Sequence, residues 1–274
     1  MNFDRRRVNG PESTHEVFYE KKQSDNVQNK RLSRKDDELR PIFLKPGLIS
    51  SASGSCYMEC GSSKIACAVY GPKQIKNAPY SSTGKLNVEI KHSPFSSVIR
   101  RDPVKVGDGC NQTLANASSK ELDATHLSNQ VTQALLPSLR LDKYEKMQID
   151  VFVTIIQDDS LDFGLMGNIT TAAGTALASA GLEMNGLVAG LAVALQADKL
   201  LLDPTPAEVR NSQAIMTVCT LPALTQITHI WQAGTLDLST YKQALSVVES
   251  ASRNIHTVIA KTLMNESNES DVST

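Results

Sequence analysis

Three aspartates and two arginines are the strongest candidates in this sequence for catalysis or for binding a metal ion or phosphate. Asp158 and Asp159 directly follow a predicted strand, and Asp162 lies three residues after Asp159. Carboxylates at the end of a strand can hold Mg²⁺ or act as a general acid, although solvated loop carboxylates are the simpler interpretation. Arg100 and Arg101 form a basic pair suited to phosphate groups, with a solvated surface pair as the alternative.

Other catalytic motifs are absent from the sequence. It contains no P-loop, GxGxxG, GxSxG or HExxH pattern, and its five histidines have no metal-ligand spacing. His229 lies in an apolar predicted strand, which is typical of a core histidine with an internal partner. Cys56 and Cys60 are four residues apart without a second ligand pair nearby, so the five cysteines favour free thiols over a zinc site. We therefore expect neither a metal nor a cofactor.

The composition restricts the possible partners. The 274 residues include 28 basic and 29 acidic side chains, for a formal charge of −1. This balance excludes a histone-like protein, so any contact with nucleic acid must come from a local basic patch. Aromatic residues make up only 5 % of the chain, with one tryptophan, which disfavours a stacking platform for bases.

The distribution of apolar residues predicts one folded domain with polar ends. Residues 1–38 are rich in charge and poor in apolar side chains, which predicts a mobile extension. The domain spans 39–264 and contains a Gly-, Asn- and Ser-rich insert at 102–124, expected to be flexible; a polar tail covers 265–274. No signal peptide is evident and the longest apolar run is too short for a bilayer, so we expect a soluble intracellular protein without a membrane segment.

Hydrophobic periodicity predicts an α+β fold, because most strands form hairpins and helices are grouped between them. Gly181 is a suitable left-handed stop for the central helix. The predicted strands are 55–60, 64–70, 86–90, 149–156, 186–196, 199–202, 214–221 and 225–232, and the predicted helices are 123–136, 169–180 and 241–259.

Five segments, in the same order, resemble blocks of ribonuclease PH-like proteins. The first contains an Arg-Pro pair and a strand ending in Gly-Pro, and together the blocks cover about residues 38–262. They are Arg40–Gln74, Ser93–Ser96, Ile149–Asp159, Ala176–Gly190 and Met216–Leu236. The resemblance implies a ribosomal-protein-S5-domain-2-like sandwich of sheets and helices, built from two related halves.

The resemblance also implies a function in RNA processing and degradation. The chain is expected to be one of six RNase PH-like subunits in the ring of an RNA exosome, capped by three proteins with S1 and KH domains. Such a ring guides single-stranded RNA towards a separate 3′–5′ exoribonuclease. The implied locations are the nucleus, the nucleolus and the cytoplasm.

The same comparison argues against catalysis by this chain. Active relatives carry an Arg-rich stretch that leads to the central helix and an Ala-Asp-Gly-Gly-Thr-Arg-Thr-like turn after the central strand. Both are needed because phosphorolysis must hold inorganic phosphate beside the RNA backbone. Here the two stretches read Asp-Ala-Thr-His (123–126) and Asp-Asp-Ser-Leu-Asp-Phe (158–163). Asp159 remains as a remnant of the acid, and Arg100 and Arg101 are expected to line the RNA path. A phosphate-dependent 3′-exoribonuclease and a free-standing protein-interaction module are the alternatives.

Overall fold

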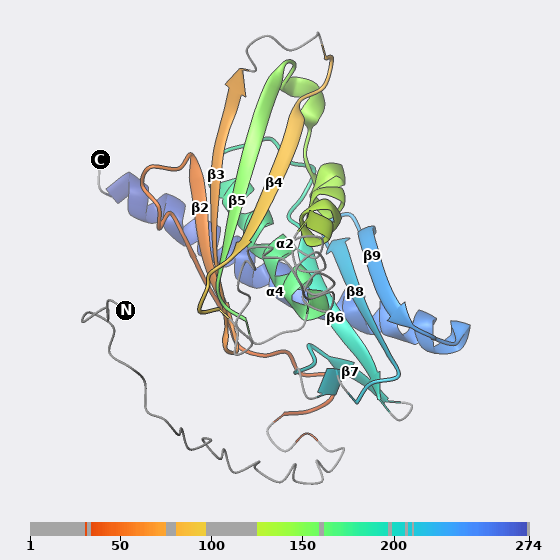
Figure 1. Cartoon of the computed structure of the whole chain (residues 1–274). Helices are drawn as coiled ribbons and strands as arrows, with labels where there is room; N and C mark the ends of the chain where they lie inside the picture. Colours follow the sequence, from red (N-terminus) through yellow and green to blue (C-terminus); the bar gives the residue numbers. More distant parts are fainter. Residues whose placement is uncertain are drawn as a thin grey trace, which may run out of the picture. The chain divides into compact units, whose positions relative to one another are not determined.

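The computed structural model describes residues 31, 34–74, 81–96, 125–158, 162–196, 199–205, 208–209 and 211–272 (Figure 1). The chain divides into two compact units, Met1–Arg34 and Lys35–Thr274, and the second contains every named helix and strand. Most of the predicted N-terminal extension and the whole 102–124 insert lie outside the described residues.

The first half of the domain forms a five-stranded sheet in the order β1-β2-β3-β5-β4. Only the neighbours β4 and β5 run parallel. Side chains along each strand alternate between the core and the opposite face, as the alternating sequence pattern predicts. The strands are β1 (Ile42–Pro46), β2 (Gly54–Cys60), β3 (Ser63–Gln74), β4 (Lys85–His92) and β5 (Met147–Gln157).

The second half forms a four-stranded antiparallel sheet in the order β7-β6-β8-β9. Every residue of β6 and β8 is buried, because helices contact these central strands and the flanking strands cover their edges. This explains the near-continuous apolar runs in the sequence. The strands are β6 (Ala189–Gln196), β7 (Lys199–Leu202), β8 (Ala214–Leu221) and β9 (Gln226–Gly234).

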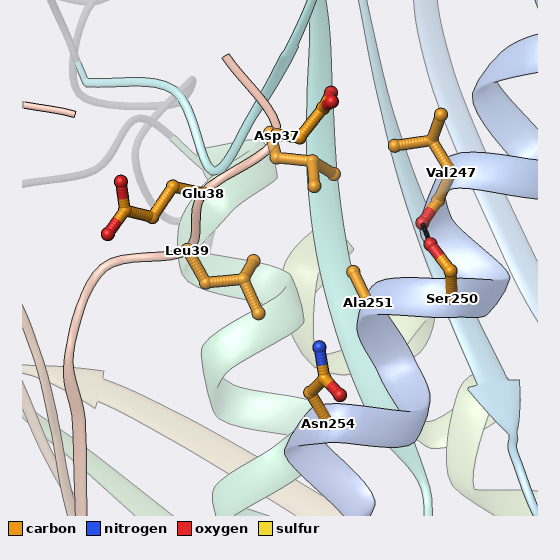
Figure 2. A pocket seen from close by; sticks show the side chains of 8 residues that line it. Asp37, Glu38, Leu39, Val247, Ser250, Ala251 and Asn254 are labelled. Carbon is orange, nitrogen blue, oxygen red and sulfur yellow. Dashed lines mark hydrogen bonds between the residues drawn. The ribbon is translucent and has the colours of Figure 1, made fainter. Parts of the chain in front are cut away.

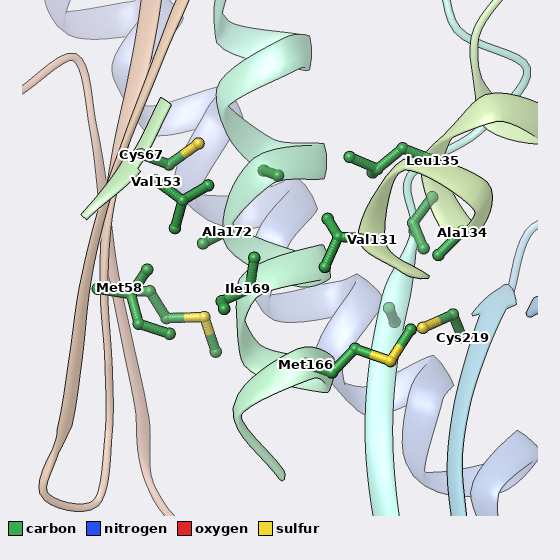
Figure 3. Packing of buried hydrophobic residues seen from close by; sticks show 14 of the residues in the cluster. Met58, Cys67, Val131, Ala134, Leu135, Val153, Met166, Ile169, Ala172 and Cys219 are labelled. Atoms are coloured by element: carbon green, nitrogen blue, oxygen red, sulfur yellow. The ribbon is translucent and has the colours of Figure 1, made fainter. Parts of the chain in front are cut away.

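Helix α2 (Asp162–Ser179) contacts both sheets and is the centre of the core. Figure 3 shows Met58 and Val153 of the first sheet facing Ile169 of α2, and Cys219 of β8 near Met166. The helix is buried on nearly all sides, and its buried threonines, Thr170, Thr171 and Thr175, donate their hydroxyl hydrogens to backbone carbonyls one turn earlier.

Glycines allow the backbone of α2 to approach both sheets closely. A Cβ atom added to Gly190 of β6 would lie 2.6 Å from the carbonyl oxygen of Gly167 in α2. On the other sheet, a Cβ atom on Gly54 would lie 2.3 Å from the nitrogen of Ala180, just after the helix. Neither position can accept a side chain without moving backbone.

Further helical segments complete the described domain. Residues 125–135 form a helix that buries Leu127, Val131 and Leu135, as predicted. The 3₁₀ turns η1 (Leu136–Ser138) and η2 (Leu141–Lys143) then lead to β5. The long helix α4 (Leu238–Val272) contacts β6, β8, β1 and α2.

A buried ion pair connects the two halves. The guanidinium of Arg40, just before β1, donates to both carboxylate oxygens of Asp203, which follows β7; the Nε–Oδ2 and Nη2–Oδ1 distances are 2.6 and 2.5 Å. Both side chains are 8 % exposed. Removing one partner of such a pair leaves an uncompensated buried charge, which costs about 3–5 kcal/mol.

The structure confirms the α+β class and the hairpins, and it differs from the predicted pattern at two helix ends. α2 begins at Asp162 rather than near Ile169, because packing against β6 overrides the weak helix propensity of Gly164 and Gly167. α4 continues to Val272, so most of the predicted polar tail is helical. Within this stretch, Glu266 accepts a hydrogen bond from Ser179 at 3.0 Å.

We expect Gly190→Ala to lower the free energy of unfolding by about 1–3 kcal/mol, because the new methyl group must displace the α2 backbone. Urea denaturation of the full chain measures the effect. Gly186→Ala is the matched control, since its Cβ would meet only Leu221 Cδ2 at 3.4 Å. Equal denaturation midpoints for the two variants would contradict this account of the packing.

Candidate nucleic-acid interface

Arg100, Arg101 and Asp159 lie outside the described residues, but the segments leading to them are in contact. The backbone N–H of Asp158 donates to the carbonyl of Ser96 at 2.8 Å, and the N–H of Ser93 donates to Ile155 at 2.9 Å. The segment that precedes Arg100 therefore runs beside the end of β5. The segments that lead to Arg100 and to Asp159 therefore leave the described structure next to each other.

An aromatic group lies where α2 begins. The ring of Phe163 stacks on Trp231 of β9, with 3.9 Å between centroids and 18° between planes. His126, from the 125–135 helix, approaches the same indole at 5.6 Å. The hydroxyl of Thr217 in β8 donates to the Phe163 carbonyl at 2.7 Å and ties the helix start to the second sheet.

A polar pair extends this group along β9. His229 Nε2 lies 2.5 Å from Oε1 of Gln130, whose amide nitrogen lies 3.4 Å from His126 Nε2. Partial burial lowers the pKa of His229, because removal from water penalises the imidazolium form. The structure thus confirms an internal partner for this histidine, although its side chain is only half-buried.

The electrostatics of these side chains are unfavourable for two adjacent anions. Phe163, Trp231, Gln130 and the histidines carry no permanent positive charge. The N-terminus of α2 favours an anion through its backbone N–H groups, but its first residue, Asp162, is itself an acid. The described side chains can shape a path and offer hydrogen bonds, and they supply no cation for phosphate.

A hollow of about 370 Å³ opens between residues 37–39 and α4 (Figure 2). Its described lining is apolar at Leu39 and Val247, and its charged lining residues are the acids Asp37 and Glu38. Two carboxylates repel phosphate, so this hollow is unsuitable for an RNA backbone.

The described cysteines are buried free thiols. Burial raises the pKa of Cys56 and of Cys219 to about 11, and raises that of Cys67 as well, so these thiols stay protonated and unreactive at neutral pH. No group of His, Cys, Asp and Glu suited to a metal occurs in the part of the chain that the structure describes. Within the same part, every helix is too short or too polar to span a bilayer.

Family models match almost all of the described domain. The model for domain 1 of the 3′ exoribonuclease family matches residues 38–183, and the model for domain 2 matches residues 186–251. The chain belongs to the 3′ exoribonuclease family, of RNase PH type.

Curated relatives cover most of the chain. It is 32 % identical to mouse exosome complex component MTR3, over 85 % of this chain and 84 % of that protein. The MTR3 component of Schizosaccharomyces pombe is 31 % identical with the same coverage. Exosome complex component Rrp41 of Nitrosopumilus maritimus is 33 % identical over 77 % of this chain and 80 % of that protein.

Solved structures share the fold. Rice Rrp46 superposes with a TM-score of 0.68 at 18 % identity, covering 85 % of this chain and 98 % of that one. An Archaeoglobus fulgidus exosome with RNA bound to its active site gives 0.65 at 19 % identity, covering 83 % and 91 %. The predicted family and fold are therefore confirmed.

Sequence reasoning missed the aromatic group around Trp231. The single tryptophan and Phe163 are 68 positions apart, and no local pattern pairs them. A signal was available in the solitary indole on a predicted strand next to His229, since large aromatics in strands require a packing partner.

The lowered pKa of His229 predicts a pH dependence of stability. Below about pH 6.5 the unfolded chain binds a proton that the folded state resists, so stability falls as the pH drops from about 7 to about 5. We expect His229→Gln to reduce this loss, with His256→Gln on α4 as a control for losing an imidazole. Denaturation midpoints at both pH values measure it; parallel profiles for wild type and His229→Gln would refute the assignment.

Proposed function

We propose that this chain is a non-catalytic ring subunit of an RNA exosome. It contributes one RNase PH-like fold to a six-membered ring that passes single-stranded RNA to a separate 3′–5′ exoribonuclease. Its neighbours are other RNase PH-like subunits, and cap proteins with S1 and KH domains bind the ring. Its work is RNA processing, including that of ribosomal RNA, and RNA degradation in the nucleus, nucleolus and cytoplasm.

The aromatic group at the start of α2 is the observation that best supports a subunit without catalytic activity. Phosphorolysis brings inorganic phosphate and a phosphodiester together, and the two anions need several cationic groups to neutralise them. Phe163, Trp231 and His126 gather here instead. Asp159 and Arg100 alone cannot balance that charge. The similarity to proteins named exosome component MTR3 supports the assembly.

A phosphate-dependent 3′-exoribonuclease is the second candidate function. The likeness to archaeal Rrp41 supports it, because this chain is as similar to that relative, at 33 % identity, as it is to the MTR3 components. A solved archaeal exosome is described with RNA in an active site, so at least one assembly with this fold holds RNA where chemistry occurs. In this alternative, Asp159 acts as the acid and a neighbouring subunit supplies the missing cations.

Reconstitution of the nuclease-free ring tests assembly and activity together. We expect the full chain to co-purify with the other ring subunits at one copy per ring, and the ring to release no nucleoside diphosphates from labelled RNA with Mg²⁺ and phosphate. Diphosphate release that disappears on Asp159→Ala would support the enzyme instead. A stable monomer that joins no ring would point to a separate interaction module.

We expect Arg100→Glu with Arg101→Glu to weaken RNA passage and leave the ring intact, because a loop contact with phosphate adds nothing to subunit packing. The salt dependence of RNA affinity should flatten by about one to two phosphate contacts. Lys199→Glu with Lys261→Glu, on exposed residues elsewhere, is the matched control. Unchanged affinity and unchanged protected RNA length in a nuclease footprint would refute the role of the arginines.

A further inference from the structure

One face of the five-stranded sheet has no helix packed on it among the described elements. The core face of β5 buries Val151, Val153 and Ile155 against α2, whereas Thr154, on the opposite face of this interior strand, is exposed. Figure 1 shows α2 and α4 on the same side of the sheet. We call the other side the open face.

Aromatic residues gather on the open face around two alanines. Tyr57 of β2 is paired with Ala66 of β3, and Phe152 of β5 is paired with Ala68. Tyr70 packs edge-on against Phe152, with 5.8 Å between their ring centroids. Because the alanine side chains are small, the rings of Tyr57, Tyr70 and Phe152 project beyond them and stay partly exposed.

Lysines surround these rings. Lys45 and Lys91 lie at the two ends of one row across the sheet, with Tyr57 and Thr154 between them. The Nζ atom of Lys73 lies 5.1 Å from the centroid of the Tyr70 ring. The open face carries five lysines, namely Lys45, Lys64, Lys73, Lys85 and Lys91, and three acids, namely Glu59, Glu89 and Asp150.

The acids do not neutralise the whole lysine set. Glu89 pairs with Lys91 at 2.7 Å, and Glu59 accepts a hydrogen bond from the Tyr57 hydroxyl at 2.6 Å. Asp150 accepts hydrogen bonds from neighbouring amide side chains. None of the ion pairs between described residues includes Lys45, Lys64 or Lys85, although Lys64 lies opposite Glu59 across β2 and β3. The open face is therefore more positive than a chain with a net charge of −1 would suggest.

We propose that the open face binds single-stranded RNA, separately from the path expected at Arg100 and Arg101. Exposed rings on a sheet stack bases without reading their sequence, and surrounding lysines neutralise the phosphates. Lysine is depleted in the buried centre of protein–protein interfaces, so the lysine frame favours nucleic acid over a protein partner. The bases stack on Tyr70 and Phe152, while Lys45, Lys64 and Lys85 contact the backbone.

Fluorescence anisotropy with the full chain and a labelled oligouridylate of about 12 nucleotides tests the site. We expect Tyr70→Leu with Phe152→Leu to weaken binding about tenfold, because leucine keeps apolar cover and removes the stacking surface. Tyr70→Phe should keep wild-type affinity. If the double variant proves unstable in urea denaturation, Lys45→Ala with Lys64→Ala tests the same surface without altering the rings.

The lysine pair should also lower the salt slope of binding by about 0.7 for each lost phosphate contact. Lys199→Ala with Lys261→Ala is its control and should retain more of the affinity and slope. Equal losses from both lysine pairs would overturn the proposal in favour of a non-local charge effect. Tighter binding of the matching oligodeoxynucleotide would overturn the assignment to RNA.

Photocrosslinking within the assembled ring separates this site from the proposed function. We expect RNA adducts on peptides containing Tyr70 or Phe152, whether or not the ring degrades RNA. Adducts restricted to peptides around Arg100 would refute the open-face site and leave the ring role intact. Release of a neighbouring subunit by the leucine or lysine variants, with RNA affinity unchanged, would show that a protein covers this face.

Discussion

Direct backbone contact between α2 and both sheets is the constraint on which the rest of the fold depends. Gly167 and Gly190 bring the helix against β6, and Gly54 brings β2 against its other end. Because these positions have no Cβ atom, the helix axis lies closer to each sheet than ordinary side chains allow. The two halves of the domain therefore share one core, and the buried Arg40–Asp203 ion pair joins them a second time.

The position of α2 also decides what the candidate interface can do. Its first turn emerges beside the end of β5 and meets β9, so Phe163 reaches Trp231 and the Ser96 segment reaches Asp158. A catalytic site of this type would need cations around the same point. Aromatic stacking there stabilises the start of the helix, and the stacked rings of Phe163 and Trp231 add no positive charge at this point.

The two faces of the first sheet illustrate how one pattern serves two purposes. Alternating residues build the core on one side and arrange Tyr57, Tyr70 and Phe152 on the other. Burial on the core face sets the register, because a shift by one residue would exchange the faces. The positions of the rings and lysines on the open face are thus fixed by packing that occurs entirely on the other side.

Local periodicity determined the hairpins, the buried runs of β6 and β8 and the amphipathic part of α4, because strong apolar patterns need little context. Residue types also predicted the internal partner of His229 and the free thiols. Tertiary packing alone decided that Gly164 and Gly167 lie within α2, that Phe163 stacks on Trp231, and that residues up to Val272 stay helical. Composition argued against a base-stacking surface, and the number of aromatic residues does not show where they lie in the fold. Strand pairing placed Tyr70 beside Phe152 from positions 82 residues apart, and a contact so distant in sequence arises only when the sheet forms.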